Sequence, residues 1–156
     1  MIDYILLQSE ITSDPLSIGY APFISSGNDQ AIADLLNQKQ YRGPVPISEL
    51  SSYCLANGLI GTLQVACQAT GVPDQIKGLC ITVTTLLKND YRLSTCDTDN
   101  VAFMTICDAL ISSSLMSSQN KTDIIAMGNN RLSRSEVLFG IGLSNSDISF
   151  ALRGQR

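Results

Sequence analysis

Residues 97–117 read DTDNVAFMTICDALISSSLMS and form the longest stretch of the chain with a helical pattern. Apolar side chains recur in it at spacings of three and four residues, which gathers them along one face of a helix. These side chains are Val101, Met104, Ile106, Cys107, Leu110, Ile111 and Leu115. The serines at 112–114, 117 and 118 weaken the end of the pattern. The stretch therefore predicts a helix, and we look for the same pattern in the rest of the chain.

The same periodicity continues on both sides of this stretch. A first short helix is expected to carry Ile2, Ile5 and Leu6, with Ser9 as a further candidate, on one face. It should end at Asp14-Pro15, because the residue before proline avoids the helical region. A loop is expected at 16–28. Further helices are predicted at about 28–39, 47–56, 59–69, 73–87, 120–127, from 133 to about 140, and 147–152. A strand competes at 81–85, where the side chains are β-branched.

Residues at the predicted helix ends agree with this division. Asn28 is expected to be an N-cap, and Gly58 can adopt the left-handed conformation after a helix. Ser133 with Glu136 fits a capping box, in which each side chain bonds to the other residue's backbone amide. We find no linker or repeat, so the expectation is an all-α protein, a single domain over residues 1–156 with roughly seven or eight short helices.

Composition limits the classes of partner. The 156 residues have a net charge of −4 and only 15% charged side chains, and the basic residues are scattered. Proteins that bind nucleic acid usually carry a basic patch, so we expect no nucleic-acid partner. No stretch reaches the length of a membrane span, and no signal peptide is recognised, so we expect no membrane partner and synthesis in the cytoplasm.

The chain contains no histidine, which removes the usual general base and metal ligand and excludes Ser-His-Asp and Cys-His mechanisms. The five cysteines contain no Cys-x-x-Cys pair and are interpreted as free thiols, with Cys67, Cys80 and Cys107 inside apolar helical patterns. No phosphate-binding or dinucleotide motif is present, so no cofactor and no metal are expected. Catalysis by paired carboxylates remains possible. The densest group of acidic residues is Asp90, Asp97, Asp99 and Asp108. The simpler interpretation is that these acids lie near helix N-termini, where their negative charge interacts favourably with the helix dipole.

Two segments lack the apolar periodicity of a core and are candidates for partner contact: 19–27 and 43–46. The residues proposed for contact in or beside them are Tyr20, Phe23, Tyr41, Arg42, Pro44 and Pro46. Ordinary connecting loops are the alternative interpretation. The pairs Tyr41-Arg42 and Tyr91-Arg92 could also stack on a base, but the acidic balance of the chain favours a protein partner.

The segment Asp14-Pro15-Leu16-Ser17-Ile18-Gly19-Tyr20-Ala21 also has a structural interpretation. Asp14 can accept bonds from the backbone amides that follow it, Pro15 fixes the chain direction and Gly19 permits an unusual backbone angle. Tyr20 could then lie over the first helix. The segment is therefore expected to form a rigid corner between two helices rather than to bind a ligand.

This opening, with Asp29, Ala33, Leu35, Leu36 and Asn37 after it, resembles a small virion-associated protein family of tailed bacteriophages with an Asp-Pro-Leu-Gly-x-Gly-Tyr-like motif. Ser17 stands where Gly is common in that turn. The ending, with Ser133-Arg134-Ser135-Glu136, Ile141-Gly142-Leu143 and Ser146-Asp147-Ile148, is similar to the Ser-Arg-Ala-Glu ending of the same proteins. The likeness covers roughly the first forty and the last twenty-five residues, and the middle has no counterpart.

The resemblance implies a non-enzymatic structural protein located in the virion, in the neck, the tail or on the capsid. Its partners would be other virion proteins, with copies arranged as a symmetric multimer. Two alternatives stay open: a phage regulatory protein that binds a host factor and is absent from particles, and a small hydrolase that uses two of the four carboxylates named above.

Overall fold

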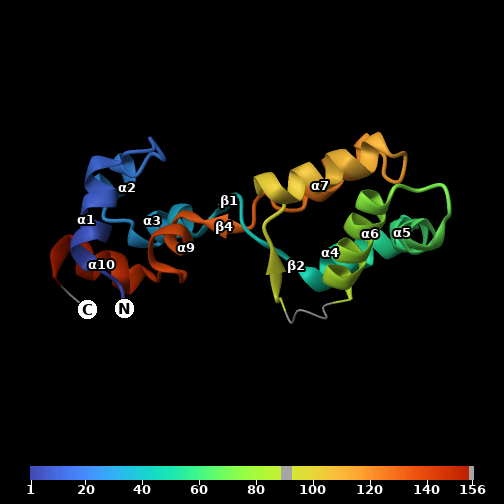
Figure 1. Cartoon of the computed structure of the whole chain (residues 1–156). Helices are drawn as coiled ribbons and strands as arrows, with labels where there is room; N and C mark the ends of the chain where they lie inside the picture. The colour runs from blue at the N-terminus through green and yellow to red at the C-terminus, as the bar shows by residue number, and fades with distance from the viewer. Residues whose placement is uncertain (89–92, 155–156) are drawn as a thin grey trace. The chain divides into compact units, whose positions relative to one another are not determined.

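The computed structural model describes residues 1–88 and 93–154, and this part of the chain forms ten helices and two short antiparallel strand pairs (Figure 1). The prediction of a mostly helical protein is confirmed, but the fold is not purely α. The strands were missed because each has only two or three residues, too few to show an alternating pattern.

Internal contacts divide the chain into two compact units. Unit 1 is Met1–Arg42 with Asn130–Arg156, and unit 2 is Gly43–Asn129. Unit 1 is thus made from both ends of the chain, and unit 2 from its middle. The single domain expected over residues 1–156 stays a prediction.

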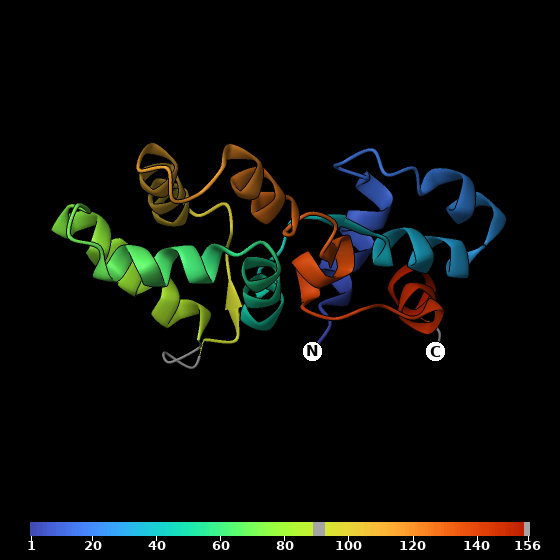
Figure 2. The ribbon, with the colours of Figure 1, turned by 90° about the vertical axis from the view of Figure 1, so that its right-hand side faces the viewer.

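Unit 1 contains five helices and one strand pair. Its elements are α1 (Tyr4–Ser13), α2 (Ala21–Ser26), α3 (Asp29–Asn37), α9 (Arg134–Phe139) and α10 (Asn145–Arg153), with β1 (Lys39–Tyr41) antiparallel to β4 (Leu132–Ser133). The C-terminal helix α10 packs against both α1 and α3, and the two ends of the chain are thereby joined in one core (Figure 2). Core residues include Leu7, Ile11, Tyr20, Ile32, Leu36 and Ile148.

The buried face of α1 differs from the predicted one. Leu7 and Ile11 are buried, whereas Ile5 is 82% exposed and Leu6 is also exposed. The sequence offers two apolar stripes on this short helix, one through Ile5 and Leu6 and one through Leu7 and Ile11. Packing against α10 selects the second stripe. The predicted face was therefore wrong because tertiary contacts decide between two locally acceptable choices.

The corner at Asp14 is formed as predicted. Asp14 ends α1 in the left-handed conformation, and its carboxylate oxygens accept bonds from the amides of Ile18 (2.7 Å) and Gly19 (2.8 Å). Gly19 has φ +99°, an angle that glycine adopts without strain. Tyr20 follows at 0% exposure, in the same core as Leu7. Where a continuous loop was expected at 16–28, α2 forms as a short helix with proline in its first turn.

Unit 2 contains the other five helices and the second strand pair. Its elements are α4 (Ile47–Ala56), α5 (Leu59–Gln68), α6 (Asp74–Leu87), α7 (Val101–Ser112) and α8 (Ser118–Ala126), with β2 (Val45–Pro46) antiparallel to β3 (Thr95–Cys96). The most extensive packing between helices is that of α5 with α6. The long stretch at 97–117 yields α7, which begins after its cap Asn100.

Residues 81–85 are helical, so the competing strand interpretation was wrong. Thr82 and Thr85 each donate a side-chain hydrogen bond to the carbonyl four residues before it, at 2.9 and 2.7 Å. This bond satisfies a β-branched hydroxyl inside a helix. None of the described helices is long and apolar enough to cross a membrane.

Candidate functional site

Four of the six candidate contact residues belong to unit 1. Tyr20 is fully buried, so its side chain presents no surface to a partner. Its hydroxyl has no hydrogen-bond partner among the described residues. Burial, and after it the charges of Glu10 and Asp14, raise the pKa of this phenol. The structure therefore places Tyr20 in the core, where it stabilises the corner.

Phe23 lies at the surface. It is half-buried and lines a shallow depression between α2 and α3, whose other lining residues are Ala31, Asp34, Leu35, Asn37 and Gln38. Tyr41 is half-buried in β1, and its carbonyl accepts a bond from the Arg131 amide at 2.9 Å. Arg42, the next residue, is exposed. Of these three residues, only Phe23 is placed in a depression where a partner could rest.

Pro44 and Pro46 belong to unit 2. Pro44 is exposed, and Pro46 is half-buried in β2 opposite Thr95. Pro46 is the residue directly before α4, and neither proline lines a described pocket. Tyr91-Arg92, the other basic and aromatic pair, lies outside the described residues.

The acidic residues do not assemble into a cleft in the described part of the chain. Asp97, Asp99 and Asp108 are exposed, and Asp108 forms an ion pair with Lys121. None of them lines a described pocket. The fourth residue, Asp90, lies outside the described residues. Paired-carboxylate chemistry needs two acids facing a shared substrate position, and this arrangement supplies no such position.

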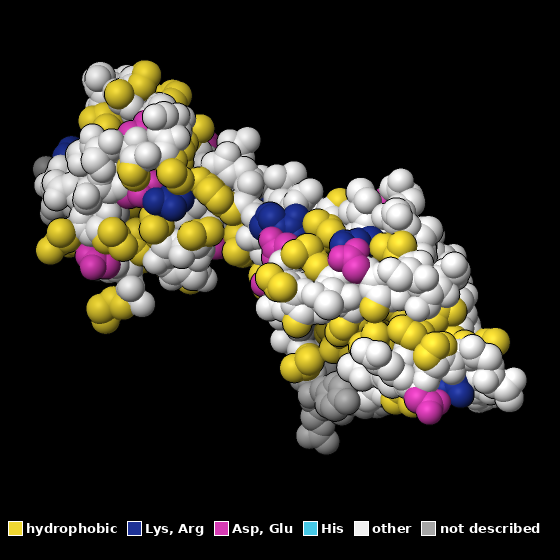
Figure 3. All heavy atoms as spheres, turned by 45° about the horizontal axis from the view of Figure 1, so that its top comes forward, with side chains coloured by type: hydrophobic (Ala, Val, Ile, Leu, Met, Phe, Trp, Pro, Cys, Tyr) yellow, Lys and Arg dark blue, Asp and Glu magenta, His cyan; other side chains and the backbone are white. Residues whose placement is uncertain are grey.

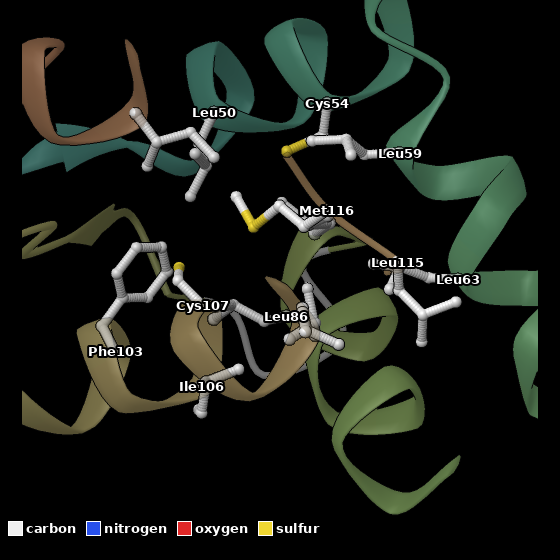
Figure 4. Close-up of a pocket in the computed structure, with 14 residues that line it drawn as sticks. Leu50, Cys54, Leu59, Leu63, Leu86, Phe103, Ile106, Cys107, Leu115 and Met116 are labelled. Atoms are coloured by element: carbon white, nitrogen blue, oxygen red, sulfur yellow. The ribbon is translucent and has the colours of Figure 1, made fainter. Parts of the chain in front are cut away.

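The core of unit 2 contains a partly open apolar cavity of about 30 Å³ (Figure 4). Met116 lies in the middle of the view, with Leu50 and Cys54 on one side and Phe103 and Cys107 on the other. All fourteen lining residues have apolar side chains or thiols. A space of this size could hold one water, but its lining offers no strong polar partner to bind one. It is also far below the several hundred Å³ of a typical ligand pocket.

The thiols of unit 2 are buried or half-buried, and all five are free. Burial raises the pKa of Cys54 and of Cys107 to about 11. A thiol with a raised pKa is protonated at neutral pH and reacts slowly. The interpretation of Cys80 and Cys107 as small buried hydrophobic residues is confirmed, whereas Cys67 is only half-buried.

An open and largely apolar surface of unit 2 is a shallow groove along α5, here named the α5 groove. It is lined by Gly61, Thr62, Val65, Ala66, Ala69, Val72 and Leu115. A second depression shares Thr62 and Leu115 with it and extends toward Ser117 and Asn120 at the start of α8. No residue lining either depression is charged. The two depressions therefore form one continuous uncharged surface.

Two features of the α5 groove suit a macromolecular contact. Val65 is 70% exposed, which leaves a β-branched apolar side chain in water. Gly61 is exposed inside the helix, and apart from the neighbouring residues and backbone of its own helix no atom lies within 4 Å of the position a Cβ would take. Glycine at such a position destabilises a helix by about 1 kcal/mol relative to alanine, and no contact in this chain requires it. Figure 3 shows one face of unit 2, without singling out the α5 groove, and apolar side chains gather on that face among uncharged polar ones.

Sequence reasoning missed the α5 groove because it treated 59–69 simply as an apolar helix. One signal could have found the groove: no charged residue occurs from Leu50 to Pro73. A solvent-facing helix normally carries charges on its outer face. An uncharged outer face is therefore informative even where the buried face looks ordinary.

No protein-family model, no curated protein and no solved structure matches this chain.

Proposed function

We propose that this protein is a non-enzymatic structural component of a tailed phage particle, in the neck, in the tail or on the capsid, and that it acts through protein–protein contacts. The observation that carries the proposal is the α5 groove, a continuous uncharged surface with an exposed valine and a helix-interior glycine. Interfaces of stable assemblies are depleted in charge at their centres, and the α5 groove has this property.

A second observation supports the phage assignment. The stretches that resemble phage virion proteins lie at opposite ends of the sequence but fold together in unit 1. Asn37 closes the first stretch and bonds to two residues of the second: its amide oxygen accepts from the Leu143 amide (2.9 Å) and the Ser135 hydroxyl (2.8 Å). Because the two short motifs contact each other, they support the resemblance more strongly than two motifs in separate parts of the fold would.

The test is quantitative mass spectrometry of purified particles from the phage that encodes the chain, with copy number measured against the major capsid protein. The proposal predicts that the chain is present in a fixed ratio. A ratio of a dozen or so copies per particle would indicate a neck ring, and a larger one a tail-wide or capsid-wide layer. Absence from particles, together with abundance in infected cells, would refute it and favour a regulatory protein that binds a host factor.

A matched pair of variants tests the α5 groove itself. Val65→Glu places a charge in the groove, and we expect incorporation into particles to fall at least tenfold, because a charge buried without a partner is strongly unfavourable. Gln64→Glu adds the same charge at the next position, which is exposed and outside the groove. Equal incorporation of the two variants would show that the groove is not the contact.

A further inference from the structure

Two cysteines are neighbours where α5 packs on α6. Cys67 lies in the last turn of α5 and Cys80 in the middle of α6, the helix pair with the most extensive packing in the described chain. Cys80 is a member of the unit 2 core, and Cys67 packs against that core. The Cys67 thiol is within hydrogen-bonding reach of the Cys80 thiol. The proposed assembly role uses neither residue.

The two thiols differ in access to solvent. Cys67 is half-buried, so part of the residue is open to solvent, whereas Cys80 has 0% exposure. Cys54 and Cys107 are both buried as well. Cys67 is therefore the more exposed member of the pair, and Cys80 is the member shielded from solvent.

We propose that Cys67 and Cys80 are a covalent modification site, which an oxidant of the peroxide class closes into a disulfide between α5 and α6. In the first step the Cys67 sulfur attacks one peroxide oxygen, the O–O bond breaks, and Cys67 sulfenic acid and one water form. In the second step the Cys80 sulfur attacks the Cys67 sulfur, the S–O bond breaks, and the hydroxyl leaves with the Cys80 proton as a second water. Two thiols and one peroxide give one disulfide and two waters.

The pH dependence of the second step follows from the environment of Cys80. Burial, and after it the neighbouring Cys67 thiol, raise the pKa of Cys80. The thiolate is the attacking species, so a raised pKa leaves little of it at neutral pH. The rate of disulfide closure is therefore expected to increase as pH rises above neutral.

The link would stabilise the α5–α6 pair, because it closes the segment 68–79 into a loop and so restricts the unfolded chain. This goes beyond the proposed function and does not depend on it, since the chemistry needs only the two thiols and the oxidant. Its biological setting would be any passage of the protein from a reducing to an oxidising compartment.

Peptide mapping of the full-length protein tests the proposal. The protein is treated with hydrogen peroxide, remaining thiols are alkylated, and trypsin is added without reductant. Cleavage after Arg42, Lys77 and Lys88 places Cys67 on the peptide 43–77 and Cys80 on the peptide 78–88. We expect these peptides to appear joined, and to separate with dithiothreitol. The melting temperature should rise by roughly 5–10 °C on oxidation and return on reduction.

The variants resolve the remaining ambiguity, because Cys54 shares the peptide 43–77 with Cys67. The joined peptides should persist in Cys54→Ala and be lost in Cys67→Ser, a change at a half-buried position that the fold should tolerate. Three results would overturn the proposal: Cys67 oxidised to sulfinic acid while Cys80 is recovered alkylated, peptides joined through Cys54, or joined peptides found only in covalent dimers.

Discussion

Different kinds of contact stabilise the interior of unit 1 and the interior of unit 2. In unit 1, specific polar bonds connect segments more than ninety residues apart, such as the bidentate contact of Arg134 with Glu10 (2.8 and 2.7 Å) and the bonds of Asn37. In unit 2, helices that follow one another in sequence pack mainly through apolar side chains around a small cavity, although the Tyr53 hydroxyl also donates to Asp123 at 2.8 Å. Distant segments need bonds with precise geometry to find one register, whereas neighbouring helices are already held close by short connections.

The largest change in stability is expected when the Glu10–Arg134 ion pair is broken. Glu10 is 4% exposed, and Arg134 is mostly buried against it. Arg134→Met should lower the free energy of unfolding by about 3 kcal/mol or more, because it leaves a buried carboxylate without its partner. Lys121→Met removes the more exposed pair with Asp108 in unit 2 and should change stability by less than about 1 kcal/mol. Urea unfolding followed by circular dichroism measures both, and equal losses would contradict the comparison.

A smaller loss is expected at Asn37. Its side chain accepts from Ser135 and Leu143 and also donates to the Leu143 carbonyl at 2.6 Å. Asn37→Ala leaves these partly buried groups without partners and should lower the free energy of unfolding by about 2 kcal/mol. Asn57→Ala, which removes one exposed bond to the Tyr53 carbonyl, is the control, with less than about 0.5 kcal/mol expected. A similar effect of the two variants would show that the Asn37 bonds contribute little.

The cavity allows a gain of stability in unit 2. Val83 lines it, and Val83→Ile adds one methylene toward the empty space. At about 24 cal/mol per Å³, filling all 30 Å³ would stabilise the protein by about 0.7 kcal/mol at most, so a few tenths are expected. Val137→Ile, at an exposed position of unit 1, should leave the melting temperature unchanged. A decrease for Val83→Ile would mean that the core is already filled at that point.

The smallest effect concerns pH and unit 1. A hydrogen bond from Lys39, and after it bonds from Ser133, lower the pKa of Glu136 to about 2, from 4.5. Because the pKa is lower in the folded state, the stabilisation is present above pH 4.5 and is lost as pH falls toward 2. The difference in unfolding free energy between the wild-type protein and Glu136→Gln should therefore shrink as pH falls from 4.5 toward 2. A difference that is constant from pH 6 to pH 2 would rule out this linkage.

Much of the fold could be predicted from the sequence, because helix ends are local. The cap at Asn28 and the capping box of Ser133 with Glu136 are present as expected. The corner at Asp14 also needs only residues within five positions of the aspartate. Such features follow from side chains bonding to nearby backbone, which sequence spacing reveals directly.

The rest could not be predicted, because it depends on contacts between distant segments. Whether Ile5 or Leu7 faces the core is decided by α10, more than a hundred residues away. No local pattern marks Glu10 as buried, because its partner Arg134 lies 124 residues later in the chain. Among the candidate contact residues, Tyr20 was chosen as an aromatic side chain in a loop, and only the three-dimensional structure shows it to be enclosed.

The pairing of β1 with β4 bears on the order in which the protein can fold during synthesis. Tyr41 pairs with Leu132, so unit 1 is complete only when residues from the end of the chain have emerged. The nascent residues 1–42 leave the ribosome with the face of α1 and α3 that α10 covers still exposed to water. Unit 2 has all its residues available before that point and can fold first. Until α10 has been synthesised, residues 1–42 therefore present an uncovered apolar surface to which a chaperone could bind.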